Sequence, residues 1–300
     1  MTTNQAGRGQ DGREQHGTSS SGNGGGTRTV AIFGASGGVG LAAVRAALGR
    51  GWKVRALARS RARLEEKLRA AGVTAGGPGL CIVEGGLGDA AAVERVVAGA
   101  DAVVCALGAP ALSRSRVRSE GTAAIVRAMQ RVGVERIVAV SVFGVAETRA
   151  QLPGFLRHVI FPLYLARAVA DHQRQEEVLA RSGLRWTAVR PPHLTDGPGD
   201  EELVHGTGVV AELGMKVSRA ALAGFLLDEL EAGAHVGAAP AVAMRAVARA
   251  PRRRETATTL APARSTVLSS SGAMAPGQSR SPAGRRAVLA ADRDRQVGAG

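Results

Sequence analysis

Seven residues near the start of the chain combine glycines and a hydroxyl at a spacing that can hold a phosphate. They are Gly34-Ala35-Ser36-Gly37-Gly38-Val39-Gly40, a GxxGxxG pattern. Glycine has no Cβ, so a pyrophosphate can approach its backbone, and a helix that begins here offers unpaired N–H groups. The pattern is informative only between a strand and a helix. Thr29–Phe33 and Leu41–Leu48 predict those two elements, which favours a dinucleotide-binding loop over a glycine turn without a ligand.

The end of the second predicted strand, Lys53–Ala58, distinguishes between the two dinucleotides. An NAD site has an acidic residue there for the ribose 2′-hydroxyl, whereas an NADP site has an arginine for the 2′-phosphate. In this sequence Arg59 follows the strand, Arg63 lies one turn later, and the first acidic residue is Glu65. A guanidinium group matches a phosphate, so NADPH is predicted. The alternative is that both arginines are solvated charges at the start of the next helix.

The elements that must position this loop alternate regularly along the chain. Further strands are predicted at Leu80–Val83, Ala102–Leu107, Arg136–Val140 and Trp186–Val189, and helices at Ser60–Ala71, Ala90–Val97, Ser119–Arg131 and Ala168–Arg181. Strands that alternate with helices indicate parallel βαβ units. We therefore expect an α/β fold, a Rossmann-type doubly wound parallel sheet with strand order 3-2-1-4-5-6 and room for a short seventh strand.

The two ends of the chain differ in composition from the middle. Residues 1–28 are mostly Gly, Ser, Thr, Asn and Gln, and residues 241–300 mix Ala, Arg, Ser and Pro without a period. Such segments bury too little apolar surface to offset the entropy of ordering. We expect a disordered leader, one Rossmann domain over 29–240, and a disordered tail. The net charge of +14 is concentrated in this tail, so a basic arm for nucleic acid or another anionic surface is the alternative.

Composition excludes several classes of function. Eight aromatic residues are too few for a stacking reader of single-stranded nucleic acid, and we expect no nucleic-acid partner. Two cysteines, Cys81 and Cys105, exclude a disulfide scaffold, and both lie in predicted strands as buried small hydrophobes. The six histidines form no ligand cluster, so no metal is expected. No apolar segment follows Met1, which predicts a cytoplasmic protein.

The most apolar stretch of the chain is Leu152–Ala170. Arg157, His158 and Arg167 interrupt it, so it predicts no membrane span. A lid over a substrate cleft or an oligomer contact is the expected use. We expect a monomer or a weak homo-oligomer that acts on a small-molecule acceptor.

Further motifs match one family in order along the chain. They are Ala31–Gly37, Leu57-Ala58-Arg59, Val97–Val103, Ser119–Thr122, Gly133–Ala139, Asp171-His172, Ser182–Trp186 and Arg190-Pro191-Pro192-His193-Leu194-Thr195-Asp196. With them the chain resembles the atypical short-chain dehydrogenases/reductases, and most of all the flavin reductase, or biliverdin reductase B, group. The resemblance extends from Val30 to about Val236. Apart from the resemblance, a histidine such as His172, beside Asp171 on a helix, more often forms a helix cap or an ion pair than a functional site.

The resemblance implies an NADPH-dependent reductase that transfers hydride to a flavin or another flat conjugated acceptor, such as biliverdin or a quinone. Flavin would be a substrate there rather than a tightly bound group. The site residues that it implies are Gly34, Ser36, Gly37, Val39 and Gly40 for the pyrophosphate, Arg59 and Ser60 for the 2′-phosphate, Leu107 and Gly108 beneath the nicotinamide ribose, Ser141 beside the nicotinamide, and Pro191, Pro192 and His193 as the wall against the carboxamide and the substrate.

The sequence departs from the family in three places. Gly86 stands where the family has an aspartate that binds the adenine, and Val142 follows Ser141 where a second hydroxyl is usual. The larger family uses a Tyr-x-x-x-Lys pair, but Ala168 stands four residues after Tyr164. Tyr164 is therefore expected to pack, and Ser141 and His193 are the candidate proton donors. The same departures fit the alternative function, a non-catalytic NADP(H)-sensing regulatory or assembly protein.

Overall fold

The structure is a computed structural model that describes residues 27–74, 77–110, 113, 115–209 and 215–245. The chain divides into two units, Met1–Ala248 and Arg249–Gly300. All described residues belong to the first unit. Most of the expected leader (1–26) and tail (246–300) lies outside the described residues.

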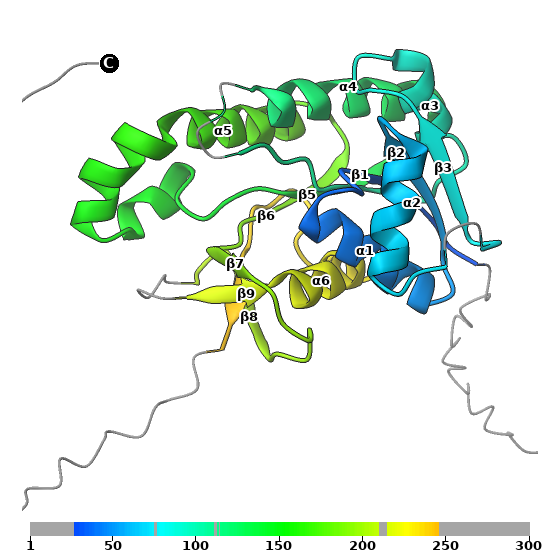
Figure 1. Ribbon diagram of the computed structural model, residues 1–300. Helices are drawn as coiled ribbons and strands as arrows, with labels where there is room; N and C mark the ends of the chain where they lie inside the picture. Colours follow the sequence, from blue (N-terminus) through cyan, green and yellow to red (C-terminus); the bar gives the residue numbers. More distant parts are fainter. Residues whose placement is uncertain (1–26, 75–76, 111–112, 114, 210–214, 246–300) are drawn as a thin grey trace, which may run out of the picture. The chain divides into compact units, whose positions relative to one another are not determined.

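Six parallel strands form the central sheet of this unit (Figure 1). They are β1 (Thr29–Phe33), β2 (Lys53–Ala58), β3 (Leu80–Glu84), β4 (Ala102–Cys105), β5 (Arg136–Val140) and β6 (Arg185–Val189). Their order is β3-β2-β1-β4-β5-β6. The predicted Rossmann-type doubly wound α/β fold and its strand order are confirmed. All five residues of β5 are buried, as expected for a strand covered on both faces.

Helices cover both faces of the sheet and enclose two cores (Figure 1). The first face carries α1 (Gly38–Gly49), α2 (Arg61–Ala70) and α6 (Arg219–Ala232); the second carries α3 (Ala90–Val97), α4 (Val117–Val132) and α5 (Ala166–Ala180). Successive β1 side chains alternate between the cores: Ile32 lies in the first and Phe33 in the second. Ser60, Asp89 and Ser218 cap α2, α3 and α6 through their side-chain oxygens.

Smaller elements follow the last strand of the sheet. They are β7 (His193–Thr195) paired with β9 (Lys216–Ser218), and β8 (Leu203–Gly206) paired with β10 (Ala241–Met244). The prediction of disorder from residue 241 is wrong for β10, because its apolar side chains are buried and Val242 belongs to the first core. Bridges from Thr187 to Ala238 and from Arg190 to Ala241 extend the edge of β6. Within the described residues, the main sheet has six strands and no seventh.

The expectation that both cysteines are buried is wrong for Cys81. Cys105 in β4 is buried, whereas Cys81 is exposed. The difference follows from topology, since β4 is a central strand and β3 is the edge strand of the sheet. An edge strand has no neighbouring strand on one side, so other residues cover its side chains less completely.

The apolar stretch Leu152–Ala170 forms helical structure outside the sheet. A 3-10 turn, η1 (Ala146–Gln151), is followed by the π-helix η2 (Leu156–Leu165), which runs directly into α5. In Figure 1 this green segment extends beyond the sheet. Phe155 and Leu163 are 66% and 71% exposed. Among the described residues, no helix has the length and apolarity that a membrane crossing requires. The lid or oligomer contact stays a prediction, and the side chain of Tyr164 lies outside the described part.

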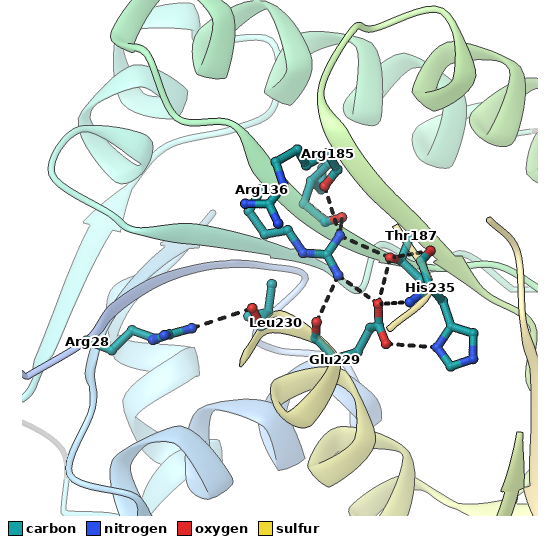
Figure 2. Close-up of polar contacts among 8 residues, drawn as sticks. Arg28, Arg136, Arg185, Thr187, Glu229, Leu230 and His235 are labelled. Atoms are coloured by element: carbon teal, nitrogen blue, oxygen red, sulfur yellow. Dashed lines mark hydrogen bonds and ion pairs between the residues drawn. The ribbon is translucent and has the colours of Figure 1, made fainter. Parts of the chain in front are cut away.

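A buried ionic network joins α6 to the amino ends of β5 and β6 (Figure 2). Arg136 Nη2 lies 2.9 Å from Glu229 Oε1, and Thr187 Oγ1 donates to the same oxygen at 3.1 Å. His235 Nδ1 lies 2.9 Å from Glu229 Oε2. Burial opposes ionisation of Glu229, but the hydrogen bonds from His235 and Thr187 outweigh it and hold the pKa of Glu229 below its ordinary value of 4.5.

We expect Glu229→Gln to lower the free energy of unfolding at pH 7 by about 3–5 kcal/mol, because it leaves the buried Arg136 charge without a counter-charge. A carboxylate with a lowered native pKa stabilises the fold at neutral pH and loses that effect as the pH falls through the native pKa. The gap between the two proteins should therefore narrow below about pH 4. Urea unfolding of both proteins at several pH values measures the loss of stability and its dependence on pH.

Glu231→Gln is the matched control on the same helix. Glu231 pairs with Arg50 at 3.6 Å, and its side chain is 49% exposed, so its loss should cost about 0–1 kcal/mol. A cost for Glu229→Gln no greater than that of the control would show that the network does not hold α6 to the sheet.

Candidate functional site

One cavity opens where the carboxyl ends of the parallel strands meet, at the β1–β4 boundary where the strand order reverses. Open α/β sheets bind their ligands at this edge. The cavity has a volume of about 950 Å³, near the upper end of the range of about 300–1,000 Å³ for small-molecule sites. Its lining comes from the ends of β1, β2, β3, β4, β5 and β6 and from the first turns of α1, α4 and α6.

The glycine loop lines the cavity after β1, between the ends of β2 and β4. Gly34 has φ +83°, and a Cβ there would overlap the carbonyl oxygen of Ala106 at the end of β4. A Cβ on Gly40 would overlap the carbonyl oxygen of Gly34, so α1 packs tightly on the end of β1. No side chain caps α1 and no acidic residue stands in its first turn. This helix N-terminus is therefore open to an anion.

Cationic side chains surround the loop. Arg59 lines the cavity from the end of β2, and Lys67 Nζ donates to Ser36 O at 2.8 Å. The Arg219 side chain lies against Gly38, with Cδ 2.6 Å from where a Cβ would stand, and its Nη1 lies 2.6 Å from Asp196 Oδ1. Among the described residues that line the cavity, none is a carboxylate. This end thus has the charge that phosphate groups require.

The structure brings most of the predicted site residues to this one cavity. Those that line it are Gly34, Ser36, Gly37, Val39, Arg59, Leu107, Gly108, Ser141, Pro191 and Pro192. Three others do not line it: Gly40 supports the packing of α1, Ser60 Oγ accepts from Arg63 N at 3.4 Å as the cap of α2, and His193 is exposed at the start of β7. Their assigned roles toward a ligand stay predictions.

The substituted adenine position also lies in the cavity wall. Gly86 lines the cavity after β3, and a Cβ placed on it would meet nothing within 4 Å. The backbone there leaves open space rather than a carboxylate. That Gly86 lies at an adenine-binding position stays a prediction.

Ser141 directly follows β5, lines the cavity and belongs to a hydrogen-bonded chain there. Its Oγ donates to Glu176 Oε1 at 2.6 Å. Arg190 holds the same carboxylate with Nε at 2.9 Å and Nη2 at 2.7 Å, and it also pairs with Glu147. The hydroxyl proton of Ser141 therefore points toward a fixed carboxylate, and its oxygen is left as an acceptor. Glu176, from α5, had no signal in the sequence.

His172 lines the cavity near Ser141 as a neutral side chain. Burial, together with the charge of Arg118, lowers the pKa of His172 from 6.5 to about 4. Its Nδ1 lies 3.3 Å from Gln175 Oε1. The expected cap is made by its neighbour Asp171, which accepts from Arg118 N and Ser119 N, both at 3.1 Å. Asp171 thus occupies the N-terminus of α4, while His172 faces the cavity.

A protein-family model described as NAD(P)H-binding matches residues 34–232. The chain belongs to the NAD(P)H-binding family. The matched region begins at the first glycine of the loop, directly after β1, and ends with α6, so it includes the cavity-lining residues other than Phe33 of β1. This membership agrees with the resemblance to atypical short-chain dehydrogenases/reductases.

Solved structures with the same fold agree with the NAD(P)H-binding family. A short-chain dehydrogenase/reductase (wide type) from Veillonella parvula DSM 2008 in complex with NADP has a TM-score of 0.61 and 19% identity, covering 73% of this chain and 95% of that one. ChuY from Escherichia coli O157:H7, an anaerobillin reductase, has a TM-score of 0.58 and 20% identity, covering 75% of this chain and 100% of that one. At these identities the likeness shows the fold.

We expect Gly40→Ala to lower the free energy of unfolding by about 1–3 kcal/mol, since the added methyl group overlaps backbone that cannot move without separating α1 from β1. NADPH binding should weaken by about tenfold or more, because the N-terminus of α1 is displaced from the loop. Urea unfolding and titration of nicotinamide fluorescence measure the two effects.

Gly49→Ala is the control at the other end of α1. A Cβ there meets nothing within 4 Å, and alanine should stabilise the protein by about 0.4–1 kcal/mol. Equal behaviour of the two variants would contradict the packing role of Gly40.

Proposed function

We propose that this member of the NAD(P)H-binding family is an NADPH-dependent oxidoreductase that transfers hydride to a flavin or a similar flat conjugated acceptor, such as biliverdin or a quinone. The observation that carries the proposal is the single cavity that extends from a phosphate-binding end, with the glycine loop and Arg59, to a neutral end at Ser141 and Pro191. We further propose a cytoplasmic protein that acts as a monomer or a weak homo-oligomer.

The preference for NADPH rests on the charge around the end of β2. Arg59 is exposed to the cavity, and among the described residues no carboxylate pairs with it. A ribose 2′-hydroxyl would have no acidic partner there, whereas a 2′-phosphate would meet a guanidinium group and the nearby cation Lys67.

The choice of a flat conjugated acceptor rests on the neutral end of the cavity. Its wall contains neutral His172, the Ser141 oxygen, and the side chains of Pro191 and Pro192. No Tyr-x-x-x-Lys pair is present in the sequence. Hydride transfer to a conjugated ring needs stacking and exclusion of water more than a strong acid, because the cofactor brings the hydride and solvent can supply the proton.

The turnover test follows NADPH absorbance with the full chain and a panel of FMN, riboflavin, biliverdin and a quinone, and repeats it with NADH. We expect acceptor-dependent oxidation of NADPH, faster than that of NADH. No oxidation with any acceptor, despite saturable NADPH binding, would reject the reductase.

That negative result would favour the alternative function, a sensor that binds NADP(H) without turnover. One observation supports this alternative: the Ser141 proton is held by Glu176 and His172 is neutral, so this end offers no charged acid. A partner protein that copurifies in fixed proportion would strengthen it.

We expect Arg59→Ala to weaken NADPH binding by about 1–3 kcal/mol and to leave NADH binding nearly unchanged, because only NADPH has the phosphate that makes a charge-assisted bond. Arg63→Ala is the control, since Arg63 is exposed one turn later and does not line the cavity. Isothermal titration with both cofactors measures the difference. Equal losses for NADPH and NADH would remove the phosphate assignment.

A further inference from the structure

A second, smaller hollow shares a wall with the main cavity. It has a volume of about 320 Å³ and lies between the residues that lead into α4 and the first turns of α5. Its lining is Ser115, Arg116, Ala166, Arg167, Ala170 and Arg174. Ser115 also lines the main cavity, next to Val117, Arg118 and His172. The small hollow therefore adjoins the neutral end, away from the glycine loop.

Three exposed arginines line this hollow, and the described residues supply no counter-ion to them. Arg167 and Arg174 lie on one face of α5, two turns apart, and Arg116 precedes α4. Within the described part of the chain, no carboxylate lies within 4.0 Å of any of these three guanidinium groups. Ala166 and Ala170 stand between the arginines and leave the space open. At these exposed positions water screens the repulsion between the arginines, and an anion between them would gain attraction from all three.

The nearby acidic residues of α5 are already engaged elsewhere. Asp171 is bound by the backbone of α4 and by the Arg118 side chain, with Nη1 3.6 Å from Oδ2. Glu176 is held by Arg190, and Glu177 accepts from Gln173 Nε2 at 3.4 Å. Asp171 also occupies the N-terminus of α4, so an anion in the hollow would be bound by arginine side chains.

We propose that this hollow binds a compact oxyanion, a carboxylate or a phosphate, carried by the acceptor whose conjugated ring lies beside Ser141 and His172. The inference rests on the proposed function and narrows its substrate class to anionic acceptors. Guanidinium groups bind both oxyanions through paired N–H donors. The glycine loop, which would hold the pyrophosphate of the cofactor, contributes no residue to the hollow, so the two anions would be held by separate sets of cations.

Two matched pairs of ligands test the charge requirement. FMN and riboflavin share one ring system and differ by a phosphate, and biliverdin and its dimethyl ester differ by two carboxylates. Binding of each to the full chain saturated with NADP⁺ is measured by fluorescence or absorbance titration, and turnover with NADPH is measured in parallel. We expect the anionic member of at least one pair to bind about tenfold or more tightly; which pair responds distinguishes a phosphate from a carboxylate.

A pair of double variants separates this hollow from the general positive charge of the chain. Arg167→Gln with Arg174→Gln should bring the charged and uncharged ligands to within about threefold of each other. Arg127→Gln with Arg181→Gln removes the same charge from exposed positions of α4 and of the end of α5 outside the hollow, and it should retain the preference. NADP⁺ affinity should be the same in both.

The possible results distinguish failure of the oxyanion site from failure of the proposed reductase activity. A charge preference that the first double variant removes, without turnover, would support the oxyanion site and reject the reductase. Turnover of all four ligands without a charge preference, or a preference lost equally in both double variants, would overturn the oxyanion site and leave the reductase. Failure of all four ligands to bind would overturn the oxyanion site, and the reductase would then stand only if a quinone is reduced in the turnover test.

Discussion

The site depends on the close approach of α1 to β1 at Gly34 and Gly40. Neither position accepts a Cβ, because each backbone lies against a carbonyl oxygen of the neighbouring segment. This contact directs the N-terminus of α1 at the edge where the parallel strands end, so the free N–H groups and the cavity coincide. The loop then lies within reach of Lys67 from α2 and Arg219 from α6. A looser helix would give the same topology without a phosphate site.

Much of the fold could be predicted because its strands are coded locally. β1, β2 and β5 are short, largely apolar strands whose predicted limits match the structure, and β1 and β5 are covered on both faces. The prediction of secondary structure failed where the apolar residues follow neither a helical nor a strand period. Helix α6 is buried around most of its circumference and was not assigned, since an apolar helix without a polar face resembles a buried strand. β10 is four residues long and is fixed by β8, which lies far away in the sequence.

In the candidate site, too, some residues could be predicted from the sequence and others could not. The glycine loop and Arg59 could be found from sequence because one turn or one strand end places them. Lys67 and Glu176 could not, since each reaches its partner across more than thirty residues, through the packing of a helix on the sheet. His193 shows the converse: its motif is specific, yet the side chain is exposed at the start of β7, and Leu194 lines the cavity. A motif locates a turn more reliably than it orients a side chain.

The distribution of charge along the cavity and the small hollow indicates which ligands they could bind. Cations gather at the glycine loop and again around the small hollow. Between them, burial keeps His172 uncharged, Arg118 pairs with Asp171, and Arg190 pairs with Glu176. Two anionic molecules could share such a cavity, since their charges are compensated at opposite ends and their uncharged rings meet in the middle. A contact of low polarity favours direct hydride transfer, because it offers few hydrogen bonds to a water molecule that would otherwise separate the rings. The carboxylates of α5 thus act by occupying other cations and leaving the arginines of the hollow free.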